Sequence, residues 1–209
     1  MDHRGVKGIV LWSAAAFAAL TCATAWGADR FNGALVGFEI TKPPGWHFMT
    51  VARDVQFAGE GQPAAAARLA AMRRHANGPL VVMTRYPEPY GDLNPSVEVA
   101  IRPLGVLKGA SPSAILAAVI TPMADEFSHY RVDQYPEATR LGGRRAAYMR
   151  FNYVLPMKDG RSVPTTSELW VVPRGDYFFL IGAGTRQDQS TGSRTEVHAI
   201  VDSVVIRDQ

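Results

Sequence analysis

Apolar and polar residues alternate along several stretches of the chain, and a period of two is typical of a β-strand with one buried face. The first such stretch, Leu35–Thr41, follows a short linker that contains Asp29 and Asn32. Val51–Phe57 is a candidate for a second, short strand. Later stretches predict further strands at Leu80–Thr84, Val97–Ile101, Val132–Thr139, Ala147–Leu155, Ser167–Val172 and Tyr177–Gly182.

A helical period marks three other segments. Apolar residues recur on one face of the alanine-rich segment Pro63–Ala76, and a second helix is predicted from Ser111, a hydroxyl cap followed by proline. Pro122 should kink or split that second helix, because proline lacks the N–H donor that the helix ladder needs. Ser193 and Glu196 have the spacing of a capping box and predict the start of a third helix.

Tight turns connect the later strands directly. Gly142–Gly143, Asp159–Gly160 and Pro173–Asp176 each separate two strand-like stretches by the few residues of a hairpin. Hairpin connections make neighbouring strands antiparallel, and the amphipathic helices must cover the faces of the sheet. The sequence therefore predicts an α+β domain, with a mostly antiparallel sheet flanked by helices in an α/β/α sandwich.

The segment after the first predicted strand is expected to be structural. Pro43 and Pro44 stop the strand because each fixes φ and supplies no N–H, while Gly45 permits a positive φ. Trp46 then carries a large apolar ring that needs a core to pack against.

These features together resemble the PsbP-like fold family. The resemblance rests on the Pro43–Trp46 turn, the Leu141-Gly-Gly-Arg-Arg-Ala146 turn into a long strand, the aromatic hairpin that follows it, and the capped C-terminal helix. The family includes the photosystem extrinsic subunit P and bacterial exported proteins of the LpqN and DcrB types. The resemblance covers about residues 34–207 and implies the fold. The Pro63–Ala76 helix departs from it, and no metal or partner site of the family is carried over.

The N-terminus has the three-part pattern of a secretory signal peptide. A basic start is followed by the apolar run Ile9–Leu20 and then by small residues, and the run is too short to span a bilayer. We expect residues 1–28 to be a signal peptide cleaved near Ala25–Ala28, and residues 29–209 to form a single domain without a stable membrane span. The alternative is a lipoprotein anchor on Cys22, the only cysteine, although the preceding residues fit that motif poorly. Either route predicts a periplasmic or secreted protein.

Composition narrows the chemistry further. The net charge is +3, and the basic residues are scattered without a recognition motif, so no nucleic-acid partner is expected. His47, His75, His129 and His198 show no metal-ligand spacing, and no nucleophile elbow or cysteine–histidine pair is present. We therefore expect no catalytic residue, no metal and no cofactor.

The loop Tyr86–Pro95 is the best candidate for a binding site. It combines Tyr86 and Tyr90 with the carboxylates of Glu88 and Asp92, and its prolines lower the entropy cost of presenting aromatic side chains. The alternative is an ordinary connection whose tyrosines pack on the edge of the sheet.

Two functions from different classes remain open. The first is an exported, non-catalytic accessory or protein-interaction module of the cell envelope, a class that includes immunity-type proteins which neutralise a toxin. Its partner would be another envelope protein. The second is a hydrolase, or another enzyme with a nonstandard site, that uses carboxylates such as Glu88 and Asp92. Carboxylates close together in a deep pocket would favour the second.

We expect the mature protein to begin between Trp26 and Arg30, because the apolar run and the small residues after it match processing by signal peptidase. The intact mass of the protein from the envelope fraction checks this. A mass that retains Met1, or a lipid on Cys22, would contradict it.

Overall fold

The computed structural model describes residues 29–52, 74–75 and 78–207. The predicted signal peptide and Cys22 lie outside these residues. So do the later part of the predicted strand Val51–Phe57 and, apart from Arg74 and His75, the predicted helix Pro63–Ala76.

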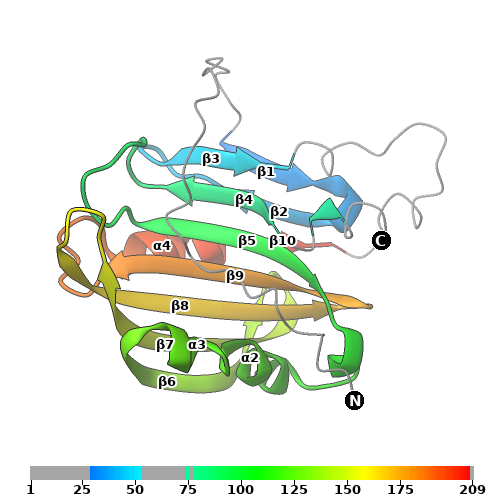
Figure 1. Ribbon diagram of the computed structural model, residues 1–209. Coiled ribbons are helices and arrows are strands. Elements are labelled where there is room, and N and C mark those ends of the chain that lie inside the picture. The colour runs from blue at the N-terminus through cyan, green and yellow to red at the C-terminus, as the bar shows by residue number, and fades with distance from the viewer. Residues whose placement is uncertain (1–28, 53–73, 76–77, 208–209) are drawn as a thin grey trace.

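The described strands form two antiparallel sheets (Figure 1). The larger has seven strands in the order β3-β4-β5-β9-β8-β7-β6. These are β3 (His47–Val51), β4 (Pro79–Thr84), β5 (Ser96–Pro103), β6 (Ser128–Leu141), β7 (Arg144–Pro156), β8 (Ser162–Arg174) and β9 (Tyr177–Arg186). The smaller has three strands, β1 (Arg30–Gly33), β2 (Phe38–Thr41) and β10 (Val205–Ile206), in the order β1-β2-β10.

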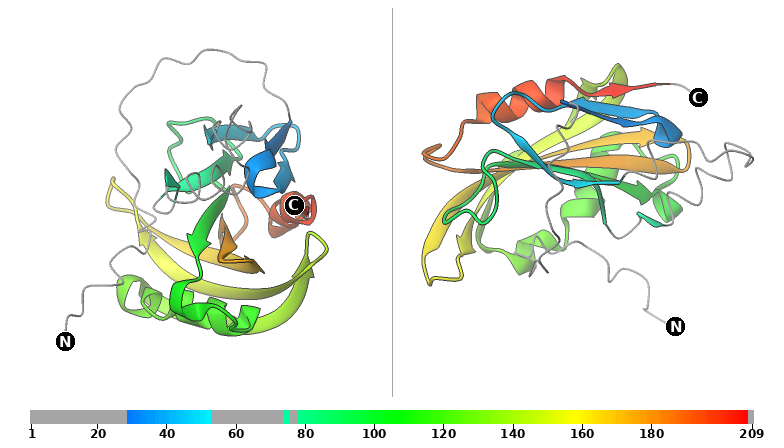
Figure 2. Two further views of the ribbon diagram at one scale, coloured as in Figure 1. Left: turned by 90° about the vertical axis from the view of Figure 1, so that its right-hand side faces the viewer. Right: turned by 90° about the horizontal axis from the view of Figure 1, so that it is seen from above.

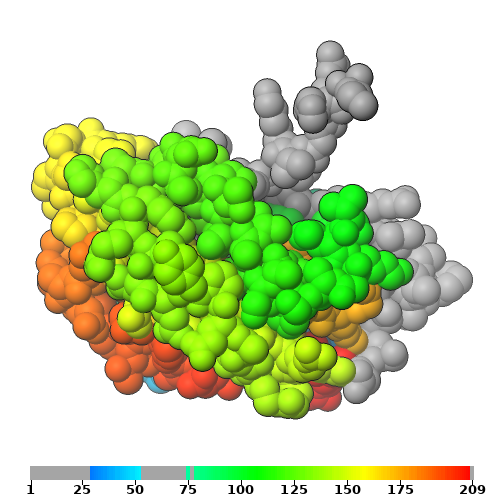
Figure 3. All heavy atoms as spheres, turned by 90° about the horizontal axis from the view of Figure 1, so that it is seen from below, coloured from blue at the N-terminus to red at the C-terminus, as the bar shows by residue number. Residues whose placement is uncertain are grey.

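Layers on both faces of the large sheet create two apolar cores (Figure 2). On one face, α2 (Pro112–Ile120) and α3 (Met123–Glu126) cover β6, β7 and β8, and together with β6 they form much of the surface seen in Figure 3. On the other face lie α4 (Arg194–Asp202) and the small sheet. The predicted α+β class, a mostly antiparallel sheet between flanking layers, is confirmed.

The hairpin predictions are confirmed, and they fix which side chains face which core. The turns at residues 142–143, 157–161 and 175–176 join β6 to β7, β7 to β8 and β8 to β9. The register pairs Met149 with Leu169 and Tyr148 with Trp170. Because side chains alternate along a strand, the first pair packs toward α2 and the second toward α4.

The predicted helix signals act as expected. The Ser111 hydroxyl accepts a hydrogen bond from the Ala114 N–H at 3.2 Å, and Pro122 separates α2 from α3. At α4, the Ser193 hydroxyl accepts from the Glu196 N–H at 3.2 Å, and the Ser193 N–H donates to the Glu196 carboxylate at 2.9 Å. This reciprocal pair satisfies two N–H groups that a helix start leaves unpaired.

Three predictions near the N-terminus need correction. The supposed linker contains β1, which was missed because its four residues include a single apolar side chain, Phe31, and give too little pattern. The predicted strand Leu35–Thr41 is divided: residues 34–36 form a 3₁₀ turn, η1, which ends where Gly37 takes a φ of +62°, and only the remainder is strand. The next strand begins at His47, directly after the proline turn, and not at Val51.

The turn between β2 and β3 places a tryptophan in the core. Pro43 and Pro44 follow the last residue pairs of β2, and Gly45 has a φ of +78°. The Trp46 N–H donates to the Pro43 carbonyl oxygen at 3.2 Å, and its side chain is only 2% exposed. The ring therefore packs in the core between the large sheet and α4.

Replacing Trp46 with alanine should lower the free energy of unfolding by ~3–5 kcal/mol, since deletion of a buried indole leaves a cavity as well as losing apolar contact. Denaturant unfolding of the variant measures this. A variant as stable as the wild type would show that the ring is not a core residue in solution.

Candidate functional site

The loop between β4 and β5, which contains the predicted site, is tied to two other segments at the same end of the sheet. Asp92 accepts hydrogen bonds from Arg186 Nη1 at 2.9 and 3.1 Å, and Arg161 Nη1 lies 3.7 Å from its second oxygen. Arg161 also donates to the Gly91 carbonyl oxygen at 2.5 Å. Arg161 belongs to the β7–β8 turn and Arg186 ends β9, so Asp92 joins three connections to one another.

Glu88 braces the same loop from within. Its carboxylate accepts from the Tyr90 N–H at 2.9 Å and from Asn94 Nδ2 at 2.8 Å. The Asn94 amide oxygen in turn accepts from the Tyr86 N–H at 3.0 Å. These bonds satisfy backbone groups that a loop of this length would otherwise expose.

The two tyrosines of the loop stack on each other. The Tyr86 and Tyr90 ring centroids lie 4.4 Å apart, with an interplanar angle of 11°. Both side chains are half-buried, whereas Pro87 and Pro89 beside them are exposed. The tyrosines therefore meet each other at the surface of a braced loop and do not lie in either apolar core.

The charged groups of the loop form contacts within the protein that stabilise the loop. Partial burial alone would raise the pKa of Asp92, but the hydrogen bonds from the Leu93 N–H and Arg186 and the charge of Arg161 together hold it below the ordinary carboxyl value. The pKa of Arg186 is raised by its hydrogen bonds to Asp188 and Asp92. Glu88 and Asp92 are thus both engaged by donors of the protein itself, which leaves neither poised as a general acid or base.

A second polar cluster, which sequence reasoning missed, lies under the first turn of α4. Glu168 on β8 is 2% exposed, and its Oε1 accepts from Arg194 Nη2 at 2.9 Å and from the hydroxyl of Tyr148. His198 Nε2 lies 2.9 Å from the same oxygen. The only sequence signal was a carboxylate inside an apolar strand, at a position whose side chain must point inward.

Ionisation states in this cluster follow from its contacts. Burial on its own would raise the pKa of Glu168, yet the hydrogen bonds from Arg194, Tyr148 and His198 lower it overall. Burial and the hydrogen bond to this carboxylate raise the pKa of Tyr148 to about 12. Glu168 therefore stays ionised and Tyr148 stays a neutral donor at neutral pH.

The first turn of α4 connects this cluster to the tyrosine loop. Glu196, which closes the capping box, also lies 3.0 Å from Arg85 Nη1 at the start of the loop. The Thr191 hydroxyl donates to the Leu93 carbonyl oxygen at 3.0 Å. At Gly192 the backbone packs so closely on Pro95 that a Cβ would lie 2.7 Å from the proline ring.

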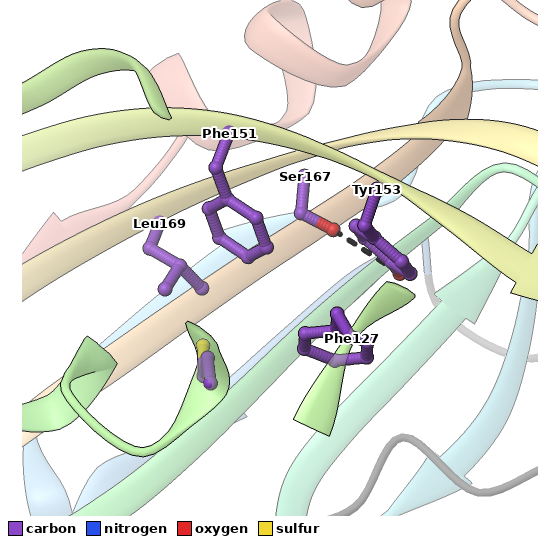
Figure 4. A pocket seen from close by; sticks show the side chains of 6 residues that line it. Phe127, Phe151, Tyr153, Ser167 and Leu169 are labelled. Carbon is purple, nitrogen blue, oxygen red and sulfur yellow. Dashed lines mark hydrogen bonds between the residues drawn. The ribbon is translucent and has the colours of Figure 1, made fainter. Parts of the chain in front are cut away.

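A shallow apolar hollow, too small to hold a water molecule, lies between α3 and the large sheet (Figure 4). Ser167 is its one hydroxyl side chain besides Tyr153, and the two oxygens lie 3.5 Å apart. No carboxylate or histidine lines this hollow, so Ser167 has no base that would make it a nucleophile. The remaining lining residues are Met123, Phe127, Phe151 and Leu169.

Two features are absent from the residues that the structure describes. No three histidine, cysteine or acidic side chains come together in a way that would hold a metal ion. No helix in the same residues has the length and apolar character needed to cross a bilayer.

Comparison with known proteins identifies the fold. No protein-family model and no curated protein sequence matches the chain. Among solved structures, the cyanobacterial PsbP protein of Synechocystis matches with a TM-score of 0.51 at 13% identity, over 90% of this chain and 98% of that one. The chain therefore has the PsbP-like fold, as its sequence motifs predicted.

Two further matches have lower scores. LpqN of Mycobacterium tuberculosis, described as involved in cell envelope biogenesis, gives 0.49 at 13% identity over 82% of this chain and 83% of that one. The Ran-binding protein Mog1p of Saccharomyces cerevisiae gives 0.48 at 10% identity over 87% and 96%. These scores add nothing to the fold assignment, and such identities say nothing about what this chain binds.

Replacing Glu168 with glutamine should lower the free energy of unfolding at pH 7 by ~2 kcal/mol, because hydrogen bonds to a charged group are lost in a buried place. The pKa of Glu168 is lowered in the folded state, so its contribution is complete above the carboxyl pKa of the unfolded chain and is lost as the pH falls through the folded value. The difference between variant and wild type should therefore shrink in acid.

Denaturant unfolding at a series of pH values from neutral to strongly acidic measures both effects. Glu137→Gln on the exposed face of β6 is the matched control and should change stability little at any pH. A constant difference between Glu168→Gln and wild type at every pH would contradict the assigned ionisation.

Proposed function

We propose that this chain is an exported, non-catalytic accessory module that binds another protein of the cell envelope. The surface that makes the contact is the tyrosine loop, defined as residues 86–95. Immunity-type neutralisation of a toxin is one form of this activity that the proposal includes. The export segment expected at residues 1–28, with Cys22 as the less favoured lipid anchor, supports a contact in the periplasm or outside the cell.

One observation carries the proposal: the stacked pair of Tyr86 and Tyr90 sits on a loop that is braced before any partner arrives. Asp92 fixes the loop from outside through Arg186 and Arg161, and Glu88 fixes it from within. A loop held in this way loses little conformational entropy on binding. Tyrosine is among the residues that most often dominate binding energy at interfaces.

The enzyme alternative has less support. It required carboxylates in a deep pocket, whereas Glu88 and Asp92 are tied to donors of their own loop and its neighbours. Glu168 is the carboxylate with the strongest set of contacts described above, but three donors converge on one of its oxygens. That arrangement holds α4 against the sheet more readily than it activates a substrate.

Replacing Tyr86 and Tyr90 together with alanine should weaken capture of the partner from the envelope fraction by at least ~1 kcal/mol, since truncation of hot-spot residues exceeds that value. The folded state should survive, because neither ring belongs to an apolar core. Affinity capture with the mature protein and thermal unfolding of the same variant measure the two quantities separately.

Tyr135→Ala is the matched control, since Tyr135 is 74% exposed and lies on β6, away from the loop. Capture should be unchanged in this control. Unchanged capture by a folded Tyr86/Tyr90 double variant would overturn the proposal. A double variant that does not fold would show that the two tyrosines are needed for folding and would overturn their assignment to the binding surface.

A further inference from the structure

The tip of the β6–β7 hairpin concentrates positive charge. Arg140, Arg144 and Arg145 flank the Gly142–Gly143 turn, and we call the two exposed residues among them, Arg140 and Arg145, the arginine tip. The strand register places Arg140 directly opposite Arg145. Like charges directly opposite each other on an antiparallel pair destabilise it. The hairpin therefore carries an electrostatic cost that a residue of opposite charge at either position would remove.

The protein does not neutralise this pair itself. Within the described part of the chain, neither Arg140 nor Arg145 forms an ion pair with a carboxylate, and Arg140 donates from Nη2 to the Gly143 carbonyl oxygen at 2.8 Å instead. Both side chains are exposed. Arg131, an exposed arginine on the same strand, does have a carboxylate partner, Asp133, at 2.9 Å.

The surroundings of the tip add to the charge. Gly142 has a φ of +56° and packs against Ile206, so the tip lies beside β10 and the C-terminal end of the described chain (Figures 2 and 3). Arg207 follows there, and its Nε lies 2.7 Å from Glu39. Arg30 pairs with the same carboxylate, so one acidic group is shared by two arginines and a positive charge is left over.

We propose that the arginine tip is a contact site for an anionic phospholipid surface. Guanidinium groups bind phosphate oxygens in a bidentate manner, and arginine keeps its charge at every relevant pH. A projecting turn without a pocket suits a flat surface of repeated phosphates better than a shaped partner, which must supply a carboxylate placed for each arginine. The site is separate from the tyrosine loop and does not depend on the function proposed above.

Co-sedimentation with vesicles tests this on the full mature chain. Vesicles of phosphatidylcholine with about 30% phosphatidylglycerol should bind the protein, and binding should fall as sodium chloride is raised. Vesicles of phosphatidylcholine alone give the baseline for binding that does not depend on lipid charge. Arg145→Gln should reduce the charge-dependent binding about fivefold, the contribution of one basic residue near such a surface.

Arg131→Gln is the matched control, because it removes the same charge from an exposed arginine on the neighbouring strand β6, away from the turn, and should leave vesicle binding close to that of the wild type. Arg145→Glu separates binding from folding. It places an opposite charge across from Arg140, so the melting temperature should stay the same or rise while vesicle binding is lost. A variant that lost vesicle binding because it misfolded would instead have a lower melting temperature than the wild type.

Three results would overturn the proposal. The first is equal binding of the wild-type protein to both vesicle types. The second is a loss of binding in Arg131→Gln as large as that in Arg145→Gln. The third is binding of Arg145→Glu at the level of the wild type. If instead the tip were needed to bind soluble poly-glutamate while the anionic vesicles were not bound, the site would belong to an acidic protein. The Tyr86/Tyr90 double variant should bind vesicles normally, which keeps this outcome distinct from that of the proposed function.

Discussion

A buried carboxylate determines where the last helix sits, and the helix in turn positions the loop that carries the candidate site. Glu168 cannot remain in the interior without hydrogen-bond donors, because an ionised group removed from water must be compensated. Two donors come from α4, Arg194 and His198, and one comes from the neighbouring strand through Tyr148. The first turn of α4 is therefore held against β8. From that turn, Glu196 reaches Arg85 at the start of the tyrosine loop.

Local sequence rules predicted most of the helices and strands. They predicted little of the chain of contacts that runs from Glu168 through α4 to the tyrosine loop. Hairpins with glycine turns, the Ser193–Glu196 capping box and the break at Pro122 each depend on neighbours within a few residues, and the structure confirms them. The short strand β1 was missed because four residues give too little pattern. Its small sheet is completed by β10, which pairs with the far edge of β2 and comes from the other end of the chain.

In the candidate site, too, the features set by neighbouring residues could be predicted, and the contacts between distant segments could not. Composition alone picked out the loop with Tyr86 and Tyr90, since prolines and tyrosines between two strands are visible in sequence. Nothing local predicts that Asp92 meets Arg186 across 94 positions, or that Arg194 meets Glu168 across 26. The first pair exists because antiparallel strands bring their ends together, and the second because α4 packs on the face of the sheet. Alternation of apolar and polar residues limits the possible strand registers, but it does not specify which residues become partners.

The two proposed contacts lie at opposite ends of β7. The strand has thirteen residues, so at about 3.3 Å per residue its ends are roughly 40 Å apart along the chain. One end continues into the turn whose Arg161 is tied to the tyrosine loop, and the other begins at the arginine tip. A rigid strand between a basic tip and an aromatic loop would hold a bound protein at a fixed distance from a membrane surface. Because the two ends share no side chain, substitutions at one should leave binding at the other unchanged, and the effects on free energy should add.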